Sequence, residues 1–157
     1  MNSVIRRDEV ESFIAQWREN NKGKQIVFTN GCFDLLHIGH VRYLKEARSL
    51  GDFLFVGLNS DSSVRKLKGL NRPIQLEDDR AEILAALRFV DATCIFSEET
   101  PLELIKQIRP DILVKGGDWK KENIVGASLV ESYGGKIFSL QFVEGKSTTS
   151  LILKSKS

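Results

Sequence analysis

The sequence predicts an α/β protein built on a doubly wound, parallel sheet of five strands with helices on both faces. Apolar segments that suit buried strands alternate along the chain with segments whose apolar residues recur at helical spacing. Several strand segments are continuous apolar runs, as expected when helices cover both faces of a parallel sheet. The 157 residues, 41% of them hydrophobic, suit one compact domain with a core.

The expected elements follow from these patterns and from the turn formers between them. A helix over residues 8–20 lies in an N-terminal segment, 1–22, which precedes a core of residues 24–150 within the single domain. The strands are expected over residues 25–28, 53–58, 92–96, 111–114 and 136–143. Helices are expected over residues 41–50, 77–88, 101–108 and 124–133, with a short one opening at 59–61 and a last one from 147 onward. Residues 67–73 form a loop that is rich in turn formers and cations.

The composition of the chain argues against several classes of binding partner. Charged residues make up 28% of the chain and nearly balance, with a formal charge of +2, whereas a dedicated nucleic-acid binder usually carries a basic stripe. Two cysteines in unlike surroundings predict no disulfide framework, which suits a reducing cytoplasm. Residues 1–7 carry no apolar signal segment, and no apolar run approaches the length of a membrane span. We therefore expect a cytoplasmic protein with no nucleic-acid or membrane partner.

The most informative stretch is Gly31-Cys32-Phe33-Asp34-Leu35-Leu36-His37-Ile38-Gly39-His40, between the first core strand and the next helix. The N-terminus of a helix offers unpaired backbone N–H groups and a partial positive charge, which suit a phosphate group. His37 and His40 are three residues apart, so both can face the same ligand.

A phosphate site in this stretch competes with a purely structural role for the histidines and with a zinc site. A lone histidine is usually structural, but His37 and His40 are the only histidines in the chain and both lie in this motif. A zinc site would use Cys32, His37 and His40, which is one ligand fewer than structural zinc normally takes. The other cysteine, Cys94, lies in a separate apolar run. We therefore expect no protein-bound metal.

Two further loops follow strands at the same edge of the predicted sheet. In Val114-Lys115-Gly116-Gly117-Asp118-Trp119, the paired glycines let the backbone approach a ligand, and Asp118 can accept hydrogen bonds from a base or ribose. A tight turn with a capping aspartate is the alternative. In Glu144-Gly145-Lys146-Ser147-Thr148-Thr149-Ser150, polar groups precede a helix and form either another anion site or ordinary capping.

Taken in this order, the motifs resemble those of the HxGH nucleotidyltransferases, the cytidylyltransferase-like superfamily, which has a Rossmann-like fold. The resemblance covers residues 24–149 and is greatest to the adenylyltransferase domain of bacterial ADP-heptose synthases. It includes the segments 65–69, 72–74, 79–82, 84–87, 100–101, 114–118 and 144–149.

The resemblance implies transfer of AMP from ATP to D-glycero-D-manno-heptose 1-phosphate, with release of pyrophosphate. It implies catalytic roles for His37, His40 and Lys68, and acceptor binding by Asp34 and Arg72. The implied nucleotide-binding residues are Thr29, Asn30, Gly31, Cys32, Phe33, Gly39, Arg80, Lys115, Gly117, Asp118, Ser147, Thr148 and Thr149. Mg²⁺ would bridge the triphosphate, mostly with water ligands.

The resemblance also raises expectations about partners. The chain is too short to hold a sugar kinase as well, which implies a stand-alone transferase with a separate kinase upstream. Many members of the family are dimers, so a homodimer is among the expectations. Three alternatives stay open: a related enzyme that uses glycerol 3-phosphate with CTP or FMN with ATP, a non-catalytic nucleotide-binding module, and a zinc protein.

Overall fold

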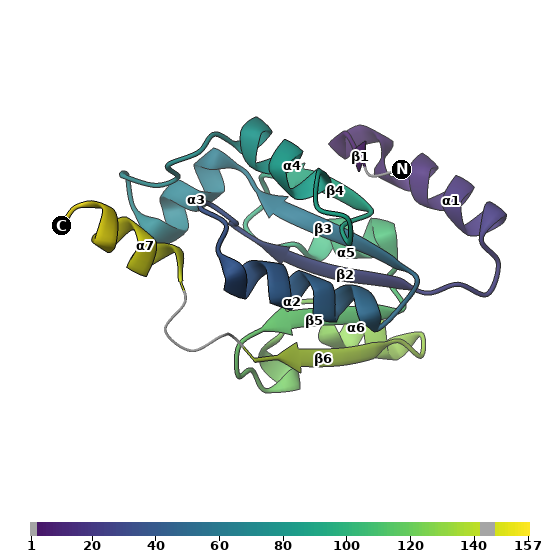
Figure 1. Ribbon diagram of the computed structural model, residues 1–157. Helices are drawn as coiled ribbons and strands as arrows, with labels where there is room; N and C mark the ends of the chain where they lie inside the picture. Colours follow the sequence, from purple (N-terminus) through teal and green to yellow (C-terminus); the bar gives the residue numbers. More distant parts are fainter. Residues whose placement is uncertain (1–2, 142–146) are drawn as a thin grey trace.

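The computed structural model describes residues 3–141 and 147–157. Over these residues, six parallel strands form one sheet in the order β1-β4-β3-β2-β5-β6 (Figure 1). The strands are β1 (Ser3–Val4), β2 (Ile26–Gly31), β3 (Phe53–Asn59), β4 (Ala92–Phe96), β5 (Ile112–Gly116) and β6 (Lys136–Leu140). The helices are η1 (Arg7–Glu9), α1 (Val10–Asn20), α2 (Ile38–Ser49), α3 (Asp61–Lys68), α4 (Glu77–Ala85), α5 (Leu102–Ile108), η2 (Lys121–Asn123), α6 (Ala127–Ser132) and α7 (Thr148–Ser155).

The predicted fold class is confirmed, but the predicted number of strands is wrong. The additional strand, β1, has two residues and pairs with the edge of β4. The Ile5 N–H donates to the Thr93 carbonyl at 2.8 Å, directly after β1. A two-residue strand is too short to show any periodicity in sequence, so only the tertiary pairing reveals it. At the other end, β6 stops at Leu140, and the predicted extension to Val143 falls partly on residues 142–146, outside the described part.

Helices cover both faces of the sheet because the strands are apolar on both sides. On one face, Phe28 and Phe55 pack with α1, α5 and α6 in one buried cluster. On the other face, Leu54 and Val56 pack with α2 and α4. All seven residues of β3 are buried. This three-layer arrangement fixes where each strand ends, and therefore where the loops that follow the strands meet.

The strand order places a switch point beside β2. From β2 the chain continues to β3 and β4 on one side, and it then returns to β5 and β6 on the other side. The loops that follow β2 and β5 therefore leave in different directions and open a crevice between them. In doubly wound sheets, ligands bind in this crevice, beyond the carboxyl ends of the strands.

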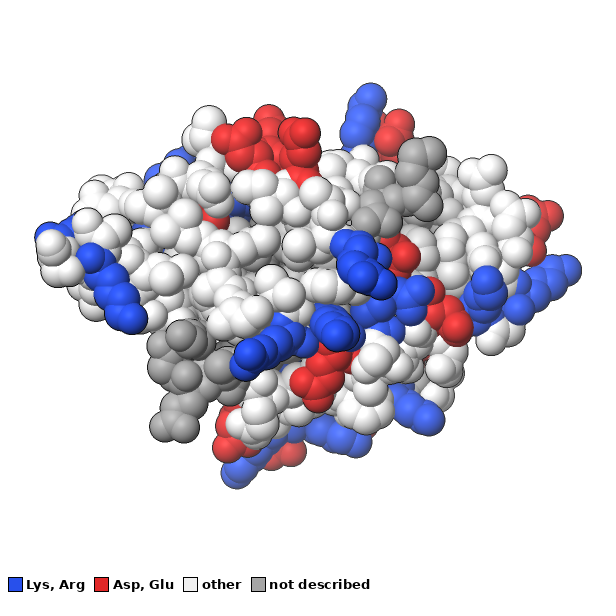
Figure 2. Space-filling view, in the orientation of Figure 1, with Lys and Arg blue, Asp and Glu red and all other residues white. Residues whose placement is uncertain are grey.

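Charges of both signs are mixed on the face that Figure 2 shows. Acidic side chains gather over α4, whose first turn carries Glu77, Asp78 and Asp79. Carboxylates at a helix N-terminus interact favourably with its dipole, so this cluster has a structural explanation. No helix in residues 3–141 or 147–157 is both long enough and apolar enough to cross a membrane.

Candidate active site

A cavity of about 720 Å³ opens at the carboxyl ends of the central strands. Many of the predicted site residues line it together: Asn30, Gly31, Cys32, Phe33 and Asp34 from the turn after β2, His37 and His40 from the start of α2, Lys68 and Arg72, Lys115 from β5, and Ser147, Thr148 and Thr149 from the start of α7. These residues span 120 positions of sequence, so the parallel sheet is what brings them together.

Five predicted nucleotide-binding residues, Thr29, Gly39, Arg80, Gly117 and Asp118, do not line the cavity. Thr29 is fully buried, and its hydroxyl lies 2.5 Å from that of Tyr43. Gly117 has φ +102°, which favours glycine, and its N–H donates to the Leu140 carbonyl. Asp118 is exposed beside the turn. The alternative role of the Gly-Gly-Asp segment, a tight turn, fits this geometry.

Sequence reasoning missed another part of the lining. The missed residues are Tyr43, Asn59, Leu67, Glu99, Thr100, Pro101, Gly116, Trp119 and Val125. Asn59 ends β3, and Glu99 to Pro101 follow β4. A signal was available, because the carboxyl ends of all parallel strands meet at one edge. The prediction considered only the loops after the first, fourth and fifth predicted strands. It therefore did not include the ends of β3 and β4.

The two histidines cap the helix that carries them. The Gly39 N–H donates to His37 Nδ1 at 3.1 Å, and the His37 N–H donates to His40 Nδ1 at 3.4 Å. This is a capping box made by imidazoles, and it starts α2 at Ile38 rather than at the predicted residue 41. The rings stack with centroids 3.8 Å apart. Each histidine therefore contributes to the structure of the turn as well as to the cavity wall.

The caps also fix where the ring protons lie. Because both Nδ1 atoms accept hydrogen bonds, the proton of each neutral ring is on Nε2. Burial, together with the nearby His37 and Lys68, lowers the pKa of His40 to about 4. His40 is thus a neutral Nε2–H donor at physiological pH. A neutral donor in a cavity wall can bind a phosphate oxygen and strengthen its hydrogen bond as charge develops there.

The turn between β2 and α2 is held in an unusual backbone conformation. Phe33 has φ +43°, in the left-handed region, and its ring is buried edge-on against His40 at 5.2 Å. A Cβ on Gly31 would lie 2.9 Å from the Phe33 ring, so the glycine makes room for this packing. Strained non-glycine residues of this kind cluster at functional sites.

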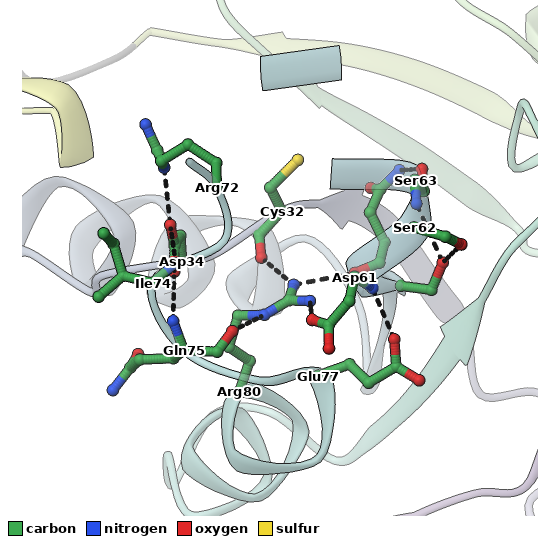
Figure 3. Close-up of polar contacts among 12 residues, drawn as sticks. Cys32, Asp34, Asp61, Ser62, Ser63, Arg72, Ile74, Gln75, Glu77 and Arg80 are labelled. Atoms are coloured by element: carbon green, nitrogen blue, oxygen red, sulfur yellow. Dashed lines mark hydrogen bonds and ion pairs between the residues drawn. The ribbon is translucent and has the colours of Figure 1, made fainter. Parts of the chain in front are cut away.

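Asp34 is predicted to bind the acceptor, but in the structure its carboxylate accepts hydrogen bonds from other protein groups (Figure 3). It is 1% exposed, and it accepts hydrogen bonds from the N–H groups of Ile74 and Gln75 and from Arg72 Nε, at 2.7–3.0 Å. Burial alone would raise the pKa of Asp34, but these hydrogen bonds outweigh it and hold the pKa below its ordinary value. Asp34 therefore anchors the 72–75 segment and sets the position of Arg72 at the cavity.

Arg80 is predicted to contact phosphates, yet its guanidinium points to protein groups, among them Asp61 and the carbonyl of Cys32 (Figure 3). It is 1% exposed and donates to the carbonyls of Cys32, Asn59 and Gln75 at 2.6–3.0 Å. It also pairs with Asp61 at 2.8 Å. The structure thus corrects this expectation, because Arg80 ties the ends of β2 and β3 to the start of α3 instead of facing the cavity.

Three cations line the cavity around Cys32. Burial raises the pKa of the Cys32 thiol, although Lys68, Arg80 and Arg72 act in the opposite direction. Burial lowers the pKa of Lys115, whose Nζ lies 5.4 Å from the ring centre of Trp119. A partly dehydrated ammonium gains most from an anionic ligand. Lys68, Arg72 and Lys115 therefore form a cationic half of the cavity, suited to phosphate groups.

The start of α7 closes one side of this cationic half. Ser147 and Ser150 form a reciprocal capping box, with hydrogen bonds of 3.0 and 3.3 Å, so these two hydroxyls serve the helix itself. The Thr148 hydroxyl donates to the Leu35 carbonyl at 2.9 Å and ties α7 to the turn after β2. The first part of the same motif, Glu144 to Lys146, lies outside the described residues.

Residues 3–141 and 147–157 contain no group of three or more His, Cys, Asp or Glu side chains that could hold a metal ion. Cys32 and Cys94 are both free thiols.

Comparisons with known proteins agree with this geometry. A cytidylyltransferase-like family model matches residues 28–148. The chain is 58% identical over 152 residues to the bifunctional protein HldE of Trichlorobacter lovleyi, covering 97% of this chain and 31% of that protein. It is 56% identical over 136 residues to the bifunctional protein HldE of Geobacter sulfurreducens, covering 87% and 28%. The chain thus spans about a third of the length of these relatives.

Solved structures show the same fold. A lipopolysaccharide core biosynthesis protein from Thermoplasma volcanium is 29% identical, with a TM-score of 0.62, and the match covers 79% of this chain and all of that one. A pantoate-beta-alanine ligase from Francisella tularensis is 16% identical with a TM-score of 0.58, covering 98% and 77%, and shows likeness of fold alone. Because the family model matches most of the chain and the relatives are highly identical to it, the chain belongs to the cytidylyltransferase-like family and is a nucleotidyltransferase.

Proposed function

We propose that this chain transfers AMP from ATP to D-glycero-D-manno-heptose 1-phosphate, giving ADP-heptose and pyrophosphate. The observation that carries the proposal is the pair of histidines at the start of α2, which line a cavity together with Lys68, Arg72 and Lys115. This arrangement suits a reaction between two anionic substrates, because donors and cations can hold both partners and stabilise the charge that develops during transfer.

In the proposed step, a phosphate oxygen of the acceptor attacks the α-phosphorus of ATP. The bond from that phosphorus to the oxygen bridging to the β-phosphate breaks, and its electrons leave with pyrophosphate. No covalent intermediate with the protein is required. His37 and His40 would donate hydrogen bonds to phosphate oxygens as charge moves onto the leaving group. Lys68, which is exposed at the end of α3 and lines the cavity, would complete the site.

The nucleotide is proposed to bind over the turn after β2, with Thr148 and Thr149 at its phosphates. Trp119 and Val125 are half-exposed apolar side chains in the same cavity and suit the face of a base. The described residues offer no carboxylate cluster for a metal ion, so Mg²⁺ would arrive with ATP, held by phosphate oxygens and water. ATP as donor and two free thiols suit a cytoplasmic enzyme.

The heptose acceptor rests on the resemblance and on two comparisons. Relatives named bifunctional protein HldE match 85–97% of the chain at 54–61% identity. A solved structure with 29% identity is named a lipopolysaccharide core biosynthesis protein. The resemblance to ADP-heptose synthases implies that ADP-heptose supplies the heptose of the lipopolysaccharide core. A sugar kinase active site outside these 157 residues would supply the 1-phosphate.

A panel of nucleotides and acceptors, measured by pyrophosphate release, tests the proposal. ATP with the heptose 1-phosphate should give the highest kcat/KM, and ADP-heptose should be recovered as the product. Activity only with CTP and glycerol 3-phosphate, or only with FMN and ATP, would assign a different acceptor within the family. Absence of pyrophosphate release with every pair, in a protein that binds ATP, would leave a non-catalytic nucleotide-binding module.

A further inference from the structure

The wall formed after β4 differs in charge from the rest of the cavity. Lys68, Arg72 and Lys115 line one half, whereas Glu99 and Thr100 line the wall beyond β4. Only two carboxylates line the cavity among the described residues, Asp34 and Glu99. Asp34 is buried and fully engaged by Arg72 and two backbone N–H groups. Glu99 is exposed to the cavity.

Within the part of the chain that the structure describes, Glu99 has no structural task that explains a carboxylate at this position. It forms no hydrogen bond or ion pair with residues 3–141 or 147–157. Its neighbour Glu98 provides a contrast, because that carboxylate pairs with Arg7 at 2.5 Å and does not line the cavity. Two adjacent glutamates thus point to different surroundings, one to an ion pair that joins β4 to the N-terminal segment and one to the cavity.

The chemistry of a lone carboxylate in a phosphate-binding cavity is selective. It repels phosphate groups, and it accepts strong hydrogen bonds from hydroxyl groups, up to two at once from neighbouring carbons of a sugar. Asn59, from the adjacent strand β3, also lines the cavity. Its position is fixed, because its side-chain amide donates to Ser63 and its carbonyl accepts from Arg80. Together these groups form a neutral-to-acidic half that suits a polyol.

We infer that Glu99 is a specificity-determining residue that accepts hydrogen bonds from hydroxyl groups of the acceptor sugar, an inference that rests on the sugar phosphate acceptor proposed above. The acceptor would lie with its phosphate toward Arg72 and Lys68 and with its hydroxyls toward Glu99. This orientation keeps the carboxylate away from the phosphate groups of both substrates. It also distinguishes a polyhydroxylated sugar phosphate from a small phosphorylated acceptor with few hydroxyls.

The variants Glu99→Ala and Glu99→Gln test the inference, with Glu103→Gln as the matched control. Glu103 is an exposed glutamate nearby on α5 that pairs with Lys106 and does not line the cavity. With ATP saturating, kcat/KM for the heptose 1-phosphate should fall about 10- to 100-fold in Glu99→Ala, as for the loss of hydrogen bonds to a charged group. Glu99→Gln should fall less, since its amide oxygen still accepts. In both Glu99 variants the KM for ATP should stay within about twofold of wild type, and the melting temperature within about a degree. The control variant should match wild type within the same limits for its acceptor kcat/KM, its KM for ATP and its melting temperature.

Calorimetric binding of the heptose 1-phosphate alone, to wild type and to the Glu99 variants, separates this inference from the proposed function. A wild type that binds the sugar phosphate but releases no pyrophosphate would refute the proposed reaction, while weaker binding by Glu99→Ala would still support the role of Glu99. An active wild type with unchanged acceptor kcat/KM in Glu99→Ala would refute the role of Glu99 alone. A selective loss of ATP affinity would also refute it, since Glu99 would then serve the nucleotide.

Discussion

Arg72 and Arg80 lie eight residues apart, and each pairs with an aspartate, at 2.7 and 2.8 Å respectively. Their surroundings differ in one respect that decides their roles. Arg80 donates from all three guanidinium nitrogens, to three carbonyls and Asp61, and its side chain is 0% exposed. Arg72 donates through Nε alone to Asp34, and its side chain, 13% exposed, lines the cavity.

The comparison shows that proximity to a phosphate site does not by itself make an arginine a phosphate ligand. A guanidinium has five N–H donors in a fixed fork. Arg80 uses four of them within the protein, and its side chain is 0% exposed, so it presents no donor to a substrate. Arg80 holds the strand ends together, while Arg72 keeps both terminal nitrogens free of hydrogen bonds to the described residues. Removing Arg80 should therefore affect stability, and removing Arg72 should affect activity.

The largest effect is expected for Arg80→Ala. The change leaves Asp61 and three carbonyls without their donor in a buried position, which typically costs about 3–5 kcal/mol. Denaturant unfolding should show this loss of unfolding free energy, and Arg80→Lys should recover only part of it, because an ammonium cannot reproduce the fork. A loss below about 1 kcal/mol would contradict the structural role assigned to Arg80.

The next effect concerns the paired histidines. His37→Ala and His40→Ala should each lower turnover by about 10² to 10³, the range for the loss of one preorganised donor. Because His37 also caps α2, its alanine variant should lose about 1 kcal/mol of stability. His37→Asn provides the matched control, since asparagine can cap the helix but lacks the Nε2 donor. It should recover the stability and not the turnover; near-normal turnover in both alanine variants would refute the mechanism.

Arg72→Ala should show the opposite profile to Arg80→Ala. Asp34 keeps its two backbone donors, so the unfolding free energy should fall by about 1–2 kcal/mol. The kcat/KM for the acceptor should fall at least about tenfold, since a tenfold loss corresponds to about 1.4 kcal/mol of barrier. Steady-state kinetics and denaturant unfolding on the same preparations check both values. A large stability loss with unchanged kinetics would make Arg72 a structural residue like Arg80.

A smaller effect links Asp34 to pH. Its hydrogen bonds hold its pKa below the ordinary value in the folded protein. The stability that Asp34 contributes is therefore complete above the ordinary carboxyl pKa of about 3.9, and it is lost as the pH falls through the lower, folded-state pKa. The difference in unfolding free energy between wild type and Asp34→Asn should stay constant down to about pH 4 and shrink as the pH falls further. A difference that stays constant below about pH 4 would contradict the assigned hydrogen bonds.

The smallest effect is expected for Cys32→Ser. The thiol lines the cavity, but burial raises its pKa and so disfavours the reactive thiolate. Cys32 contributes to the turn through its backbone carbonyl, which accepts a hydrogen bond from Arg80. Turnover should stay within about tenfold of wild type, or about 1.4 kcal/mol. A greater loss would indicate that the thiol takes part in the reaction.

The sequence by itself determined the fold class, most of the strands and helices, and the segments that build the site. These features depend on signals that are local in sequence: continuous apolar runs for β3, helical spacing for α1, and a glycine-bounded turn with two histidines before α2. The motifs each follow a strand, which placed them at one edge of the sheet. Their resemblance, in this order, to those of the HxGH nucleotidyltransferases indicated nucleotidyl transfer.

Only the tertiary structure decided which polar side chains face the cavity. Asp34 and Arg80 have the charge expected of ligands, but their hydrogen bonds are made to protein groups that lie 38 to 41 residues from Asp34 and up to 48 residues from Arg80 in sequence. The sequence pattern predicted no role for Glu99. The end of β4 nevertheless places it in the cavity, whereas its neighbour Glu98 pairs with Arg7. The two-residue strand β1 likewise depends on a partner 89 positions away. A side chain's role depends on which partners remain for its donors and acceptors, and those partners come from segments that only folding brings together.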